Sequence, residues 1–72
     1  MSLKKLYNDI CIQIADRWHI EYQSAVNLTY YAKIFGTSET AMKGILLRNP
    51  DMIEILPDWW TSKKYIKTQT FL

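Results

Sequence analysis

Residues 32–48 read AKIFGTSETAMKGILLR, and this stretch decides the fold. Ala32 is followed four residues later by Gly36, and the step Thr-Ser-Glu then leads into a second amphipathic run. Glycine adopts a left-handed backbone without steric cost, so Gly36 is suited to end one helix and turn the chain into the next. A small residue such as Ala32 lets two short helices cross at close range. The stretch therefore predicts two helices joined by a tight turn, with Ala32, Met42 and Ile45 in their shared core.

Two helical segments are predicted before this turn. Apolar residues recur at three- and four-residue steps over residues 3–18, which indicates a first helix there. Residues 19–23 fit either a short extended segment or a continuation of that helix. A further helix is expected over residues 24–35, and Ser24 or Asn27 begins it, because either side chain can cap the free N–H groups of its first turn.

The second helix of the pair is predicted over residues 37–48, with Thr37 or Ser38 as its N-cap. Gly44 lies inside this helix, where a glycine costs about 1 kcal/mol relative to alanine. We interpret Gly44 either as a place where another backbone approaches closely or as a tolerated weakness.

The segment after the pair predicts a short helix and a hairpin. Asn49 and Pro50 break the chain, because the residue before a proline avoids helical backbone. Residues 50–56 fit a short helix or a strand, and a proline at the first position favours the helix. Residues 58–67 carry apolar pairs on either side of a polar Thr-Ser-Lys-Lys step, which predicts a β-hairpin.

The composition bounds the class of protein. A chain of 72 residues is expected to form one domain, and 49% hydrophobic with 14% aromatic residues argues against disorder. Cys11 is the only cysteine, and no run of residues is apolar enough to span a membrane, so we expect a cytoplasmic protein. One histidine and two glycines offer no metal cluster, phosphate loop or catalytic set. We therefore expect no enzyme, no metal site and no cofactor.

The charges are unevenly distributed along the chain. Residues 33–48 carry three cations against one anion, and residues 61–72 carry three lysines and no anion. Residues 49–60 between them carry three anions and no cation. If the fold brings the two basic segments to one face, that face can hold a polyanion such as DNA. If it does not, the charges form an ordinary solvated surface.

The spacing of the helix pair resembles that of helix-turn-helix proteins, which carry a small residue in the first helix, a glycine at the turn and apolar anchors in the second helix. These places are filled here by Ala32, Gly36, Met42 and Ile45. Over residues 28–72, which include the basic run KKYIKTQTF, the chain resembles the small winged-helix excisionases and MerR-like DNA-binding proteins of phages and mobile elements. Thr37 departs from the family, which often has an aliphatic residue there. The resemblance implies a mostly α-helical fold: a three-helix helix-turn-helix core with a short C-terminal β-hairpin wing.

The resemblance also implies a function, that of a small transcription regulator or recombination accessory factor that binds duplex DNA. Residues 38–48 would be the recognition helix in the major groove, and basic residues of the wing would contact the phosphate backbone. With so few contacts, tight binding would need a homodimer or a partner protein. The DNA-binding residues implied in this way are Lys33, Thr37, Ser38, Glu39, Thr40, Lys43, Leu47, Arg48, Lys63, Lys64 and Lys67.

The alternative is a small protein-binding module, an inhibitor or adaptor of phage origin that uses exposed aromatic side chains. Trp59 and Trp60 would point to opposite faces of a strand, one buried and the other partly exposed. Tyr7, Trp18 and Tyr22 fit either the core or a dimer surface. A further interpretation is that the helix pair only fills the core and binds nothing.

Overall fold

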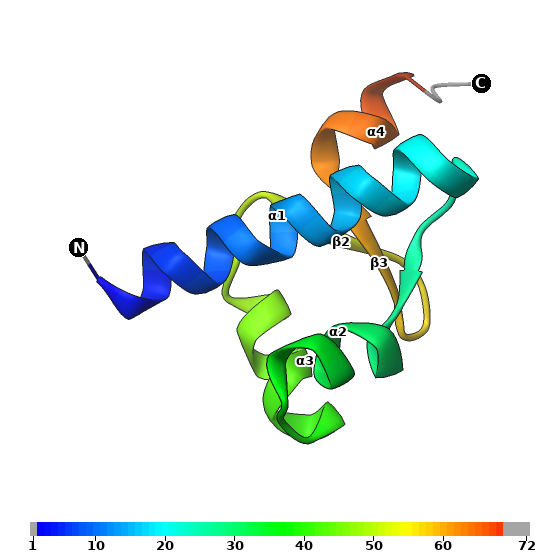
Figure 1. Cartoon of the computed structure of the whole chain (residues 1–72). Coiled ribbons are helices and arrows are strands. Elements are labelled where there is room, and N and C mark those ends of the chain that lie inside the picture. The colour runs from blue at the N-terminus through cyan, green and yellow to red at the C-terminus, as the bar shows by residue number, and fades with distance from the viewer. Residues whose placement is uncertain (1, 69–72) are drawn as a thin grey trace.

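The computed structural model describes residues 2–68, with side chains described as far as residue 66. The fold is mostly helical, with one small antiparallel sheet of three strands (Figure 1). The elements follow in the order α1 (Leu3–Tyr22), β1 (Val26–Asn27), α2 (Leu28–Phe35), α3 (Glu39–Leu47), β2 (Met52–Leu56), β3 (Trp59–Ser62) and α4 (Lys63–Thr68).

Helix α1 continues past residue 18 to Tyr22, which confirms the continuation of the first helix that was one of two alternatives for residues 19–23. The rings of Trp18 and Tyr22, one turn apart, lie 4.5 Å from each other and support this extra turn. The helix ends at Gln23, whose left-handed backbone (φ 54°) lets its N–H donate to the carbonyl of His19 at 2.7 Å. The extended alternative for residues 19–23 is therefore wrong.

Helix α2 begins at Leu28, so of the two predicted caps Asn27 is confirmed and Ser24 is wrong. The cap is Asn27, whose Oδ1 accepts from the N–H of Thr29 at 2.9 Å. Val26 and Asn27 are held in extended conformation because they pair with Trp60 and Trp59 of β3. A sheet partner more than thirty positions away thus overrides the local helical pattern.

The turn between α2 and α3 follows the prediction. Gly36 has φ 69°, and the N–H of Thr37 donates to the carbonyl of Ala32 at 3.0 Å. Ser38 caps α3 by accepting from the N–H of Ala41 at 3.2 Å. The expected shared core is confirmed, since Ala32 and Met42 are buried and Ile45 is half-buried against them. The exposed fractions of Ala32 and Met42 are 5% and 0%.

The segment after α3 differs from the prediction. Residues 52–56 form strand β2, so the short helix over residues 50–56 is wrong. The Oδ1 of Asn49 accepts from the N–H of Asp51 at 3.0 Å and holds Pro50 in a turn. The strand then forms because Met52 and Ile53 find partners in Ser62 and Thr61.

The hairpin is therefore formed by β2 and β3 and turns at residues 57–58, where Asp58 has φ 68°. The predicted hairpin over residues 58–67 is wrong, because Thr61 and Ser62 are buried in β3 and do not form a turn. The lysines that follow lie in helix α4, not in the second strand of a wing.

The strand order is β1-β3-β2, so β3 is the central strand. Trp60 on β3 is 2% exposed and its neighbour Trp59 is 39% exposed, as the alternation along a strand predicts. The carbonyl of Trp60 accepts from the hydroxyl of fully buried Tyr31 at 3.0 Å, which joins α2 to the sheet. The core between the sheet and the helices consists of Cys11, Ala15, Val26, Leu28, Tyr31, Ala32, Met42, Leu46, Met52 and Trp60. Among the described residues, no helix has the length and apolar character needed to cross a membrane.

Candidate functional site

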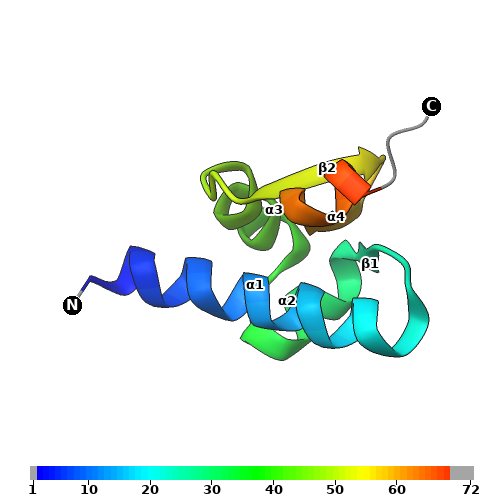
Figure 2. The same cartoon turned by 90° about the horizontal axis from the view of Figure 1, so that it is seen from above.

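The two basic segments lie on different sides of the molecule. Figure 1 shows α2 and α3 on one side of α1, and α4 on the other side, beside the C-terminal half of α1. Seen from above, in Figure 2, α4 lies beside β2 and apart from α2. Lys63 and Lys64 therefore do not extend the basic surface of α3.

Lys64 is occupied by a contact with α1. Its Nζ lies 2.9 Å from the Oδ1 of Asp16, and the hydroxyl of Tyr65 donates to the same oxygen at 2.6 Å. The hydrogen bond to Asp16 raises the pKa of Lys64, and burial followed by the bond to Asp16 raises the pKa of Tyr65. The ring of Tyr65 also stacks on His19, with centroids 3.7 Å apart. These contacts attach α4 to α1, while Lys63 is exposed and the side chain of Lys67 lies outside the described residues.

The N-terminal end of α3 presents polar side chains to solvent. The hydroxyl of Ser38 is used in the cap, and the Oε2 of Glu39 accepts from the hydroxyl of Thr29 on α2 at 2.9 Å. Thr37 and Thr40 are exposed, and their side chains make no hydrogen bond to any residue that the structure describes. Their hydroxyl groups are available to a ligand.

Three cations are spread along the helix pair, from α2 to the C-terminal end of α3. Lys33 on α2 is exposed and forms no ion pair with a described residue. Lys43 on α3 lies 3.7 Å from the carboxylate of Asp58 in the hairpin turn. Arg48 follows α3, and its guanidinium lies over Gly44, 3.4 Å from the place where a Cβ would be. The neighbour of Gly44 is thus a side chain, and the close backbone approach considered for Gly44 is wrong.

The surface of α3 therefore has mixed charge. Two carboxylates accompany the three cations. Glu39 lies on α3, and Asp58 lies opposite Lys43 in the hairpin turn. Leu47, which the resemblance places in the groove, is 64% exposed and apolar. Three cations against two anions leave this surface a net charge of only +1, and the charge of Lys43 is held next to that of Asp58.

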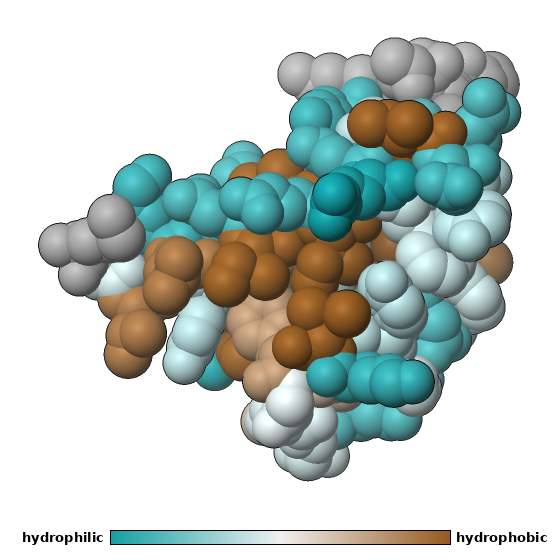
Figure 3. All heavy atoms as spheres, in the orientation of Figure 1, coloured by the Kyte–Doolittle hydropathy of each residue, from teal (hydrophilic) through white to brown (hydrophobic). Residues whose placement is uncertain are grey.

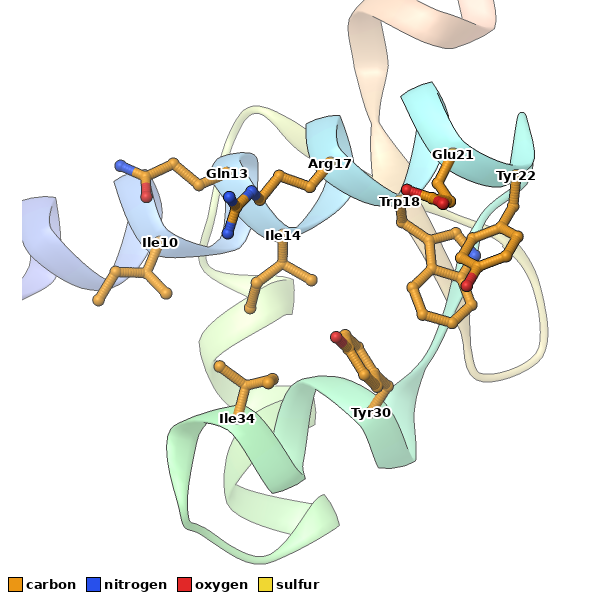
Figure 4. Close-up of a pocket in the computed structure, with 9 residues that line it drawn as sticks. All are labelled: Ile10, Gln13, Ile14, Arg17, Trp18, Glu21, Tyr22, Tyr30 and Ile34. Atoms are coloured by element: carbon orange, nitrogen blue, oxygen red, sulfur yellow. The ribbon is translucent and has the colours of Figure 1, made fainter.

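A second surface feature is a groove of mixed polar and apolar lining between α1 and α2, which we call the α1–α2 groove. Its volume is about 400 Å³. Figure 3 shows the band of apolar side chains that lies between the polar outer side of α1 and helix α2. The groove is lined by Ile10, Gln13, Ile14, Arg17, Trp18, Glu21 and Tyr22 of α1 and by Tyr30 and Ile34 of α2 (Figure 4).

Aromatic rings form one end of the α1–α2 groove. The ring of Trp18 lies 4.5 Å from that of Tyr22 and 4.8 Å from that of Tyr30. The Nε1 of Trp18 donates to the hydroxyl of Ser24 at 3.2 Å, which fixes the orientation of the indole. Sequence reasoning named Trp18 and Tyr22 as surface candidates but missed Tyr30 and Ile34, because only the packing of α2 against α1 shows which side of α2 faces the groove.

The single cysteine of the chain, Cys11, is buried. Cys11 on α1 is 0% exposed, and burial raises the pKa of its thiol to about 11. A thiol reacts as a nucleophile only in its thiolate form, and at neutral pH this thiol keeps its proton. We therefore read Cys11 as an unreactive core residue. Among residues 2–66, no three histidine, cysteine or acidic side chains come together in a way that could hold a metal ion.

Comparison of the chain with family models, with curated proteins and with solved structures found no match. The chemistry of the two surfaces described above is therefore what indicates a function. These are the helix pair of α2 and α3, with the polar end of α3 and three cations along the pair, and the α1–α2 groove.

Proposed function

We propose that this protein binds duplex DNA with α3 as its recognition helix. The observation that carries the proposal is the helix pair itself. Gly36 turns the chain so that α3 packs on α2 through Ala32 and Met42 and leaves its other side in solvent. A helix held in this way, with free hydroxyls at its N-terminal end, is suited to a major groove.

The proposal assigns the contacts differently from the sequence pattern. The hydroxyls of Thr37 and Thr40 would reach phosphates or base edges, and Lys33, Lys43 and Arg48 would contact phosphates. The hairpin of β2 and β3 follows the helix pair, as a wing does, but its turn carries Asp58 instead of lysines. Lys63 and Lys64 on α4 would take no part.

The charges set the expected strength of binding. Three phosphate contacts give a slope of about −2.7 in a plot of log affinity against log salt concentration, at about −0.9 per phosphate. Such a slope is shallow for a sequence-specific protein. A single copy would therefore bind weakly at physiological salt.

The test is a gel-shift titration against mixed duplex DNA at two salt concentrations, with Lys43→Ala and its matched control Lys63→Ala. Lys43→Ala should weaken binding and reduce the salt slope by about one phosphate contact. Lys63→Ala removes the same charge from α4 and should leave the affinity unchanged. Absence of a shift at low salt, or equal effects of the two substitutions, would contradict the proposal.

One observation favours a second candidate function, binding of another protein. Trp59 is 39% exposed and lies beside Leu56, which is 62% exposed, on the hairpin. In this function the helix pair is only a scaffold. Trp59→Ser would then abolish capture of the partner, and DNA would not be retarded even at low salt.

A further inference from the structure

We propose that the α1–α2 groove is a self-complementary interface that a second copy of this chain occupies. The two α1 helices would pack antiparallel about a two-fold axis near Trp18. This inference goes beyond DNA binding and does not depend on it.

The groove offers the apolar area that such an interface needs. Tyr22 is 59% exposed, Ile34 52% and Tyr30 38%, although all three side chains are large and apolar over most of their surface. A standard interface buries about 800 Å² on each partner. That is roughly one sixth of the 4944 Å² of surface on this chain. About an axis near Trp18, two antiparallel α1 helices overlap only over their last two turns, because α1 ends at Tyr22 and its N-terminal part projects away from this region (Figure 2). Much of the area must therefore come from Tyr30 and Ile34 on α2.

The charges at the edge of the groove point to a second copy rather than to an unrelated protein. Arg17 and Glu21 lie one turn apart on the α1 side of the groove (Figure 4), and neither forms an ion pair with a described residue. In an antiparallel pair of α1 helices, Arg17 of each copy lies opposite Glu21 of the other. A two-fold axis uses the same patch twice, so one Arg-Glu step yields two interchain ion pairs. An unrelated partner would have to carry the matching charges independently.

The aromatic rings suit the centre of such an interface. Trp18, Tyr22 and Tyr30 are already packed against one another, so little side-chain freedom is lost when they are covered. Tryptophan and tyrosine are also the residues that most often dominate binding energy near the middle of an interface. The charged pair of Arg17 and Glu21 would then form the rim.

The first experiment measures the mass of the chain by sedimentation equilibrium, without DNA, from low micromolar to near-millimolar concentration. The wild type should form dimers in a concentration-dependent way. Arg17→Glu alone and Glu21→Arg alone should each weaken the dimer on the order of tenfold, because both interchain pairs become repulsive. The double variant Arg17→Glu/Glu21→Arg should restore it. A mixture of the two single variants should also form dimers, since each pair across the axis is then attractive.

The second experiment distinguishes association through the groove from nonspecific hydrophobic association. Ile34→Ser removes an exposed isoleucine from the groove and should weaken the dimer. Ile55→Ser, the matched control, removes one that is 39% exposed on β2, outside the groove, and should not. Circular dichroism of each variant shows that the helices are intact. A wild type that stays monomeric at all concentrations overturns the proposal and leaves the groove to a partner of different sequence. Failure of the double variant to restore dimers also overturns it. Neither result bears on the gel shift, which reports on α3.

Discussion

Lys43 of α3 and Asp58 of the hairpin turn face each other across the junction of the two elements, with 3.7 Å between the Lys43 Nζ and the Asp58 carboxylate. Both side chains are about half exposed, so the pair itself adds little stability. The ion pair matters because Lys43 lies on the surface that we propose binds DNA. There the carboxylate of Asp58 offsets the charge with which Lys43 would attract a phosphate.

The first prediction concerns this pair. Asp58→Asn should strengthen DNA binding by roughly two- to fivefold at low salt, because it frees Lys43 and removes a charge that repels phosphate. Asparagine also tolerates the left-handed backbone at this position, where φ is 68°. The measurement is the gel-shift affinity. Asp51→Asn removes an exposed carboxylate beside α4 and makes the same change in net charge, so it is the control; an equal gain from it would contradict a local effect.

The second prediction compares the two glycines. Gly36→Ala should lower the free energy of unfolding by roughly 1–2 kcal/mol, because its φ of 69° is unfavourable for a residue with a Cβ, although no atom lies within 4 Å of that Cβ. Gly44→Ala should raise it by about 0.5–1 kcal/mol, because alanine favours the helix and would meet only the flexible side chain of Arg48 at 3.4 Å. Urea denaturation measures both. A gain in stability from Gly36→Ala would contradict the left-handed turn, and a loss from Gly44→Ala would show that the Arg48 side chain does not yield.

The helix pair could be predicted from the sequence because its determinants are local. Ala32, Gly36 and Ser38 act through bonds to residues a few positions away, and their pattern is readable in a single stretch. The sheet could not be predicted in the same way. Ser62 looks like part of a polar turn until Met52 is placed opposite it.

The candidate site was predictable only in part for the same reason. Lys43 was correctly placed on α3, but nothing in the sequence indicates that Asp58 would lie beside it. The lysines after Ser62 match the basic strand of a wing in composition. In the structure these lysines lie in helix α4, where Tyr65 stacks on His19 and Lys64 contacts Asp16. The α1–α2 groove depends on how two helices pack, which periodicity alone does not give.

The third prediction tests the attachment of α4. Asp16→Ala removes the carboxylate that holds both Lys64 and Tyr65, so amide hydrogens of α4 should exchange faster while those of α2 and α3 keep their protection. Hydrogen exchange measured by mass spectrometry gives the comparison. Asp9→Ala, which breaks the exposed pair with Lys5 on the same helix, should leave α4 unchanged. Unchanged exchange in Asp16→Ala would mean that other contacts hold α4.

The fourth prediction concerns pH. The pKa of Cys11 is raised from 9.0 to about 11 by burial, so the folded state keeps a proton that the unfolded state releases above pH 9. This contribution to stability is fully present below pH 9 and is lost as the pH rises towards 11, by at most about 1.4 kcal/mol per pH unit. Urea midpoints measured over this range should fall more steeply for the wild type than for Cys11→Ala. If the urea midpoint fell equally steeply with pH in both proteins, the raised pKa of Cys11 would be contradicted.

The arrangement of the small sheet also limits how the molecule can aggregate. Within residues 2–68, the outer strands β1 and β2 each pair with β3 along one edge only, and a free strand edge in many proteins recruits further strands. Here β1 has only two residues, and β2 is interrupted by a bulge at Ile55 and is followed by Pro57. Neither edge offers a flat, continuous row of donors and acceptors to an incoming chain. Concentrated solutions should therefore resist growth into fibrils by strand addition, and association through α1 would end in closed pairs.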